Sequence, residues 1–143
     1  MTRRNSDIII GYTQGTYDMF HIGHLNLLQN AKRLCDILVV GVNSDELVKE
    51  YKQKSAIIPL EERMAIIQAL RCVDKVIACE TLDKKVAFEN IHFKRLFIGD
   101  DWKGNERWAA TELEMKSLGV EVVFLPYTKN TSSTLLREKL SGY

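Results

Sequence analysis

Cysteine is scarce in this 143-residue sequence, which has only Cys35, Cys72 and Cys79 and no C-x-x-C pair. An odd, unpaired set excludes a disulfide framework and favours free thiols buried beside apolar residues in a reducing compartment. Structural zinc sites usually have paired ligands, so we expect no metal site. Zinc held by one cysteine and two histidines is kept as an alternative.

The sequence also lacks a long apolar run and an excess of either charge. Its basic start, MTRRNSD, is followed by only three isoleucines before Gly11, which is too short for a signal peptide or a membrane span. The formal net charge is +1, with lysines and glutamates mixed along the chain. The composition therefore indicates neither a nucleic-acid nor a membrane partner, and we expect a cytoplasmic protein.

What the sequence does contain is an alternation of short apolar runs with segments of helical period. The runs are DIII, DILVVGV, DKVIA, RLFIG and VEVVFL, and helices are expected near residues 22–34, 44–52, 60–70, 83–90, 109–118 and 133–140. Runs that are apolar throughout are typical of strands covered on both faces. The alternation predicts one α/β domain over residues 1–143, a Rossmann-like doubly wound parallel sheet of about five strands with helices on both faces. Residues 1–7 and 141–143 are expected to be flexible.

Polar segments follow most of these runs: TQGTYDMFHIGH, NSD, GDDWKGN and PYTKNTSST. In an open parallel sheet these exits share one edge, and ligands bind there at the point where the strand order reverses. The site is expected at that edge. Neither G-x-G-x-x-G nor a Walker loop occurs, so the two common nucleotide fingerprints are missing.

Two of the three histidines, His21 and His24, flank Gly23 at the predicted start of the first helix. One histidine alone is more often a core residue bonded to a carbonyl group. The pair differs, because Gly23 lets a ligand approach backbone N–H groups at a helix N-terminus, where an anion is favoured. We interpret the pair as a phosphate site.

Arg63 and Arg71 lie on the apolar stripe of the third predicted helix, with Leu60, Met64, Ile67 and Leu70. Their aliphatic stems could pack while the guanidinium groups reach water. Two arginines on the core-facing side more often meet an anion, because a buried guanidinium needs a partner and matches phosphate oxygens. We therefore expect both arginines at the anion site.

Two further groups of polar residues carry open interpretations. Lys52 and Lys54 precede that helix, in a segment that is either simply solvated or functional. Ser132, Ser133 and Thr134 open the last predicted helix, where one hydroxyl is explained by N-capping and three together would suit ribose or phosphate oxygens.

These residues resemble a known family. GTYDMFHIGH is similar to the G-T-F-D-x-x-H-x-G-H signature of the nucleotidyltransferase superfamily that includes the cytidylyltransferases. ALRCVD resembles its R-Y-V-D segment, and YTKNTSST stands in the place of its R-T-E-G-I-S-T-S element. The resemblance runs from about Ile8 to Leu140 and is strongest to the glycerol-3-phosphate cytidylyltransferase branch, through KQK at 52–54 and GDDWKG.

The resemblance implies a reaction of CTP with a small phosphorylated alcohol, glycerol 3-phosphate, that gives CDP-glycerol for polymers of the teichoic-acid type. It implies Mg²⁺ bound with the triphosphate, and a homodimer. The catalytic residues it implies are His21, His24, Lys54 and Arg71, and the acceptor phosphate would be held by Lys52 and Lys85. The nucleotide-binding residues it implies are Thr16, Tyr17, Ile22, Gly23, Arg63, Tyr127, Thr128, Ser132, Ser133 and Thr134.

The sequence departs from the family pattern at Tyr127, which stands where the family has an arginine, and this puts triphosphate affinity and nucleotide choice in question. PLEERM also resembles adenylyltransferases that act on heptose 1-phosphate. Alternatives are therefore ATP with a sugar phosphate, CTP with choline or ethanolamine phosphate, and a non-catalytic module that binds a nucleotide.

Overall fold

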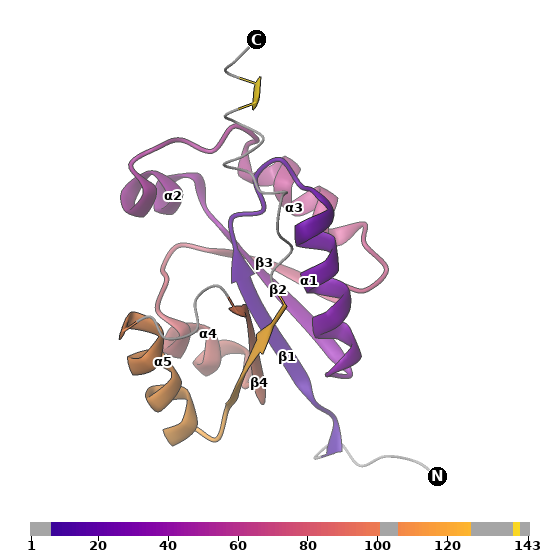
Figure 1. Ribbon diagram of the computed structural model, residues 1–143, viewed down its shortest axis with the longest axis vertical. Helices are drawn as coiled ribbons and strands as arrows, with labels where there is room; N and C mark the ends of the chain where they lie inside the picture. The colour runs from indigo at the N-terminus through magenta and orange to yellow at the C-terminus, as the bar shows by residue number, and fades with distance from the viewer. Residues whose placement is uncertain (1–6, 101–105, 127–138, 141–143) are drawn as a thin grey trace.

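A computed structural model describes residues 7–100, 106–126 and 139–140 and places five strands in one sheet (Figure 1). The order is β3-β2-β1-β4-β5, and every neighbouring pair is parallel. Their bounds are Ile10–Gly15 for β1, Ile37–Asn43 for β2, Lys75–Cys79 for β3, Arg95–Gly99 for β4 and Glu121–Leu125 for β5. The predicted Rossmann-like parallel sheet is confirmed, and its order reverses between β1 and β4.

Helices connect the strands and cover both faces of the sheet. Their bounds are Ile22–Arg33 for α1, Asp45–Lys52 for α2, Leu60–Gln68 for α3, Lys84–Ile91 for α4 and Glu106–Ser117 for α5. The helices α1 and α3 lie on one face, while α4 and α5 lie on the other (Figure 1). The described helices include none that is long and apolar enough to cross a membrane.

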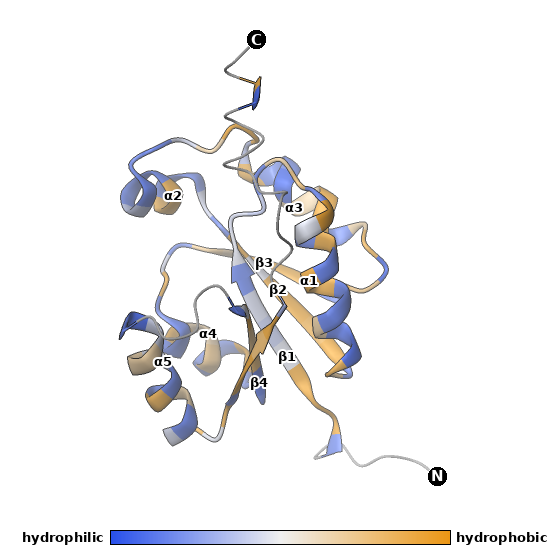
Figure 2. Ribbon diagram, viewed as in Figure 1, coloured by the Kyte–Doolittle hydropathy of each residue, from blue (hydrophilic) through white to orange (hydrophobic). Residues whose placement is uncertain are grey.

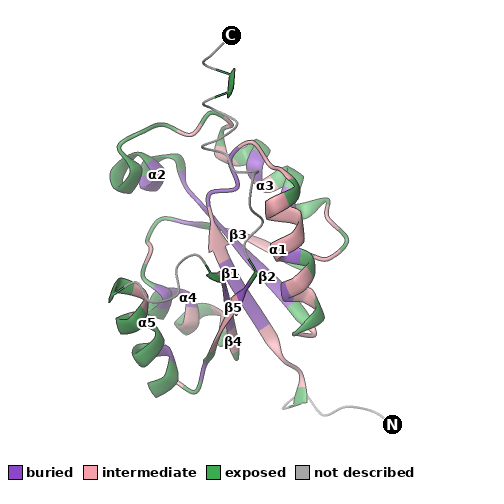
Figure 3. Ribbon diagram, in the orientation of Figure 1, coloured by how far each residue is buried: buried purple, intermediate pink, exposed green. Residues whose placement is uncertain are grey.

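Two apolar clusters, one on each face, hold these layers together. In β2, Leu38, Val40 and Val42 point to the cluster under α1 and α3, whereas Val39 belongs to the cluster under α4 and α5. This is the alternation of a strand with both faces covered. In Figure 2, β2 is largely orange, whereas β1 turns from orange to pale and blue toward its carboxyl end, and Figure 3 shows both strands largely buried.

The first strand differs from its prediction. The apolar run ends at Ile10, but β1 extends from Ile10 to Gly15 and includes polar residues. These side chains find partners inside the sheet edge: Thr13 Oγ1 donates to the Phe97 carbonyl at 3.0 Å, and Gln14 Nε2 donates to Asn43 Oδ1 at 2.8 Å. Because the apolar pattern stops where the polar edge begins, it could not show the strand's end.

The other element bounds agree closely with prediction, except that α5 begins at Glu106 rather than near residue 109. Most of the helix predicted at 133–140 lies outside the described residues. The three cysteines are free thiols, with Cys79 buried and Cys35 and Cys72 half-buried. Burial raises the pKa of the Cys35 thiol to about 11, so this group stays protonated at neutral pH.

Candidate active site

A pocket of about 860 Å³ opens at the carboxyl ends of β1 and β4, where the strand order reverses. The exit of β1 forms its floor with residues 13–18, and β4 contributes residues 97–99. Its lining also includes His24 of α1, Lys52 and Lys54, and a further group formed by Lys84, Arg107 and Trp108. The site therefore lies at the predicted edge, with several cationic side chains in its lining.

His21 and His24 are fixed by the helix start that they form. His21 is the N-cap of α1, and its Nδ1 accepts a hydrogen bond from the Gly23 N–H at 3.0 Å. His24 completes a capping box, because its Nδ1 accepts from the His21 N–H at 3.2 Å. The two rings are stacked with their centroids 3.9 Å apart.

These two hydrogen bonds determine the protonation of both rings. A ring nitrogen that accepts a backbone N–H carries no proton, so each neutral imidazole has its proton on Nε2. Burial lowers the pKa of His21, and burial reinforced by His21 lowers the pKa of His24 to about 3. Neither Nε2 has a hydrogen-bonding partner within the described residues. Both rings are thus neutral, directional donors; of the two, His24 lines the pocket, and His21 is not among the lining residues that the structure describes.

The same capping changes the expectation for Gly23. Gly23 was expected to let a ligand approach backbone N–H groups at the helix N-terminus, and in the structure the N–H of Gly23 itself donates to His21 Nδ1. Ile22, between them, is 52% exposed. The helix start therefore offers imidazole Nε2–H groups in place of the Gly23 amide.

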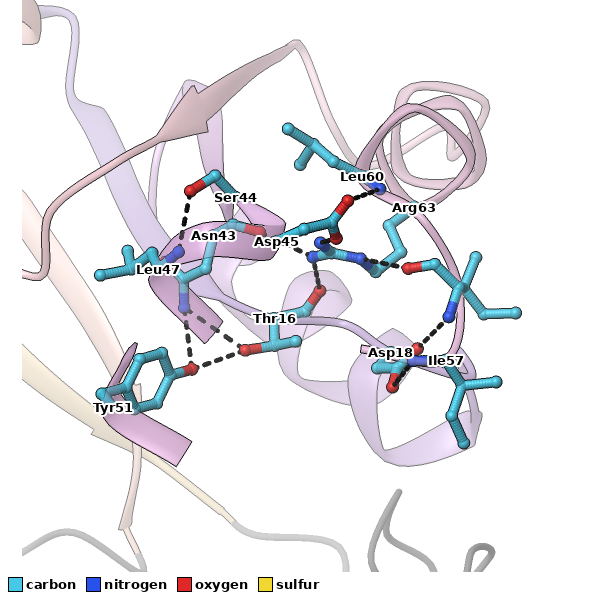
Figure 4. A network of polar contacts seen from close by, with 11 residues as sticks. Thr16, Asp18, Asn43, Ser44, Asp45, Leu47, Tyr51, Ile57, Leu60 and Arg63 are labelled. Atoms are coloured by element: carbon cyan, nitrogen blue, oxygen red, sulfur yellow. Dashed lines mark hydrogen bonds and ion pairs between the residues drawn. The ribbon is translucent and has the colours of Figure 1, made fainter. Parts of the chain in front are cut away.

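Thr16 and Tyr17 form part of the pocket wall and are both buried. The Thr16 hydroxyl is 2.6 Å from the Tyr51 hydroxyl, which also accepts from Asn43 Nδ2 at 3.1 Å (Figure 4). Tyr17 has a positive φ of 53°, which is strained for a residue with a side chain. The packed network around the β1 exit holds this conformation in place.

Lys84 was not among the predicted site residues. It is only 8% exposed, its Nζ donates to the Leu82 carbonyl at 2.8 Å, and it lies over the Trp108 ring at 5.4 Å. Burial lowers the pKa of Lys84 to about 8. A buried ammonium group in a pocket with Arg107 nearby is suited to an anionic ligand.

Lys85 was predicted to bind the acceptor, but it is exposed and is not among the residues that line the pocket. The signal that distinguishes the two lysines is helical spacing. Lys84 lies three and four residues before Ala87 and Phe88, which pack in the core on the α4 side of the sheet. Arg107 and Trp108 were missed because α5 begins earlier than its apolar pattern.

Arg63 is buried as predicted, but its partners belong to the protein. Nε donates to the Ile58 carbonyl at 2.8 Å, and Nη1 donates to the carbonyls of Thr16 and Asn43 at 2.7 and 2.8 Å. Nη2 pairs with Asp45 at 2.6 Å (Figure 4). The guanidinium does have the anionic partner that burial demands, and this partner is a carboxylate of α2.

The expectation that Arg71 lies on the core-facing side is wrong. The helix α3 ends at Gln68, and Arg71 is exposed in the turn that leads into β3. That turn lies at the amino end of β3, so it is at the opposite edge of the sheet from the pocket. Its place on the apolar stripe required the helix to continue three residues beyond Gln68.

Five predicted nucleotide contacts, Tyr127, Thr128, Ser132, Ser133 and Thr134, lie outside the described residues. No group of three or more histidine, cysteine, aspartate or glutamate side chains that could hold a metal occurs in the described part of the chain. In the described lining of the pocket, Asp18 is the sole carboxylate, and its two oxygens accept the N–H groups of Ile57 and Ile58. This donor set does not form a protein-held metal site.

Most of the chain is similar in sequence to cytidylyltransferase-like proteins. A family model described as cytidylyltransferase-like matches residues 12–139. Glycerol-3-phosphate cytidylyltransferase of Bacillus subtilis (strain 168) is 37% identical over 131 residues, which cover 91% of this chain and 95% of that protein. The bifunctional protein HldE of Yersinia pestis (strain Pestoides F) is 37% identical over 131 residues, which cover 91% of this chain and 27% of that longer protein.

The fold recurs in a solved structure, a lipopolysaccharide core biosynthesis protein from Thermoplasma volcanium GSS1. It superposes with a TM-score of 0.72 at 27% identity, over 87% of this chain and 99% of the other. The similarity in sequence and in structure therefore extends over nearly the whole chain.

The protonation state of His24 predicts a pH dependence of stability. With its pKa lowered from 6.5 to about 3, folded His24 stays neutral while the unfolded chain takes up a proton below pH 6.5. The free energy of unfolding therefore falls as the pH drops from 6.5 toward 3, by at most about 1.4 kcal/mol per pH unit for this group. Urea denaturation between pH 5 and 7.5 measures the slope.

His24→Asn should flatten that slope, because the amide keeps an acceptor near the Nδ1 position and does not titrate. The matched control is His92→Asn, since His92 is exposed at the C-cap of α4 with φ of 54°, a conformation that asparagine tolerates. Equal slopes for wild type and His24→Asn would contradict the assignment.

Proposed function

The chain belongs to the cytidylyltransferase-like family of nucleotidyltransferases, and we propose that it condenses CTP with glycerol 3-phosphate to give CDP-glycerol and pyrophosphate. The observation that carries the proposal is the pocket at the β1–β4 reversal, whose lining includes His24 and the cationic side chains of Lys52, Lys54, Lys84 and Arg107. The similarity to a glycerol-3-phosphate cytidylyltransferase over almost its whole length supports this choice of substrates. CDP-glycerol would supply polymers of glycerol phosphate.

The reaction needs positioning more than it needs proton transfer. The acceptor phosphate is already anionic at neutral pH, so one of its oxygens attacks the α-phosphorus of CTP without a general base. A new bond forms between that oxygen and the α-phosphorus. The bond from the α-phosphorus to the oxygen bridging toward the β-phosphorus breaks, and its electron pair leaves with pyrophosphate.

The histidines suit this chemistry as hydrogen-bond donors. A ring with a pKa of about 3 takes up a proton too rarely at neutral pH to act as an acid or base in turnover. Its Nε2–H can donate to a phosphate oxygen on which charge develops. Lys52 and Lys54, in the pocket wall beside His24, would supply the positive charge.

Magnesium is expected to arrive with the triphosphate. The described pocket lining offers Asp18 as its carboxylate, and both of its oxygens already hold the chain at Ile57 and Ile58. Phosphate oxygens and water would therefore provide the metal's ligands. The ion supplies neutralisation of the triphosphate charge when bound.

The acceptor end would be formed by Lys84, Arg107 and Trp108. Two cationic side chains here favour a phosphate monoester whose other groups are uncharged, such as a polyol phosphate. Choline phosphate carries a quaternary ammonium group, which these charges would repel. The pocket therefore supports a polyol phosphate over choline or ethanolamine phosphate.

The resemblance of PLEERM to adenylyltransferases that act on heptose 1-phosphate favours one rival, the same chemistry with another nucleotide or a sugar phosphate. A panel of CTP and ATP against glycerol 3-phosphate, heptose 1-phosphate and choline phosphate, read by pyrophosphate release, tests the proposal. We expect CTP with glycerol 3-phosphate to be fastest. Turnover with ATP and none with CTP would reject the nucleotide, and CTP binding without pyrophosphate from any acceptor would indicate a non-catalytic module.

His24→Asn should reduce the turnover number by about 10²–10³, because the variant keeps the capping acceptor and loses the Nε2–H donor. Steady-state pyrophosphate release measures the effect, and His92→Asn should retain wild-type turnover. Activity of His24→Asn within a few-fold of wild type would show that the imidazole does not contact the reacting phosphates.

Lys84→Met should raise the KM for glycerol 3-phosphate by about tenfold or more, because the change removes a buried ammonium donor and keeps the side-chain length. Lys85→Met, one residue further on and exposed, should leave this KM unchanged. The opposite result, a raised KM for Lys85→Met alone, would restore Lys85 as the acceptor ligand.

A further inference from the structure

We propose that Asp18 and Arg63 are positioning residues that hold the lysine loop, residues 53–59, so that Lys54 stays in the pocket; the kinetic part of this inference rests on the proposed function. The loop connects α2 to α3 and begins directly after Lys52. It carries Lys54 into the lining of the pocket.

The loop is held at one short stretch, by both of these residues. Asp18 Oδ2 accepts from the Ile57 N–H at 2.9 Å, and Asp18 Oδ1 accepts from the Ile58 N–H at 2.9 Å. Arg63 Nε donates to the Ile58 carbonyl at 2.8 Å. Both backbone polar groups of Ile58 are thus bound by buried, oppositely charged side chains.

The same two side chains also connect to the pocket floor, and we call this set of hydrogen bonds the Asp18–Arg63 clamp. Arg63 Nη1 binds the Thr16 carbonyl at the β1 exit and the Asn43 carbonyl at the end of β2. Asp18 itself belongs to the β1 exit and is 3% exposed. One guanidinium and one carboxylate therefore connect the strand ends under the site to the loop that presents Lys54.

Apolar packing gives the loop little support of its own. Ile57 is 55% exposed, and Ser55 and Gln53 are exposed as well. Gln53, the first residue of the loop, has φ of 55° and caps the end of α2 in the left-handed conformation. Hydrogen bonds to Asp18 and Arg63 are consequently the interactions on which the position of Lys54 depends, and buried charged partners make such bonds strong.

A double-mutant cycle between Asp18→Asn and Lys54→Ala tests the coupling. Asp18→Asn turns an NH₂ group toward a backbone N–H and should lower kcat/KM for CTP by about tenfold or more. If Asp18 acts through Lys54, the double variant should be no worse than Lys54→Ala, within about twofold. Additive losses, with the double variant about tenfold worse than Lys54→Ala, would overturn the proposal.

Asp36→Asn is the matched control for lost stability. Asp36 Oδ2 also accepts a backbone N–H, from Ile9 at 2.8 Å, but at the amino edge of the sheet away from the pocket. This variant should lose stability and keep the wild-type kcat/KM. If Asp18→Asn does not fold, Ile57→Pro removes the same hydrogen bond from the exposed loop side and should give the same non-additive result.

Limited proteolysis gives a readout that does not depend on activity. Trypsin cleaves after Lys52 and Lys54, and we expect Asp18→Asn or Ile57→Pro to be cut there at least about tenfold faster than wild type and Asp36→Asn, because local opening exposes the site. Unchanged cleavage would overturn the positioning role. If the variants are cleaved faster but the wild-type protein releases no pyrophosphate, the proposed function is rejected, and the role of Asp18 in holding the loop is still supported.

Discussion

The chemistry of this site depends on two hydrogen bonds, from the amides of His21 and Gly23 to the Nδ1 atoms of His24 and His21. Because the rings cap the helix, neither can take a second proton without losing its cap. Burial acts in the same direction, since it lowers the pKa of both rings. The same contacts that begin α1 thereby fix the tautomer of its histidines, so local folding and the proposed chemistry cannot vary independently.

The lysines and the histidines of this site differ in the charge that they carry. Lysines provide net positive charge, and neutral imidazoles provide directed N–H groups that do not add to the repulsion among those lysines. The parallel sheet brings these groups together because the ends of β1 and β4 meet where the order reverses. Arg63 stabilises the same edge of the sheet, because its guanidinium donates hydrogen bonds to the carbonyls at the ends of β1 and β2.

Periodicity was sufficient to predict the sheet, its parallel strands and most helix bounds, because burial on both faces leaves a pattern in the sequence. Proximity across the fold leaves no such pattern. Arg63 was correctly expected to be buried, but it was expected at a phosphate site, and nothing local shows that Asp45 and three carbonyls converge on it. The family resemblance named Lys85 as an acceptor residue, whereas the core-facing side of α4 carries Lys84, one residue earlier, into the pocket lining. Arg71 failed because its place on a helical stripe required a helix that ends earlier.

The central claim is that both histidines are neutral Nε2–H donors at physiological pH. Nitrogen-15 NMR of the imidazole rings, recorded from pH 5 to 8 without ligand and with CTP, tests it most directly. The account predicts Nε2–H tautomers for His21 and His24, no titration of His24 in this range, and a shift of the Nε2–H resonances when CTP binds. Titration of His24 near pH 6.5, or protonation at its Nδ1, would contradict it.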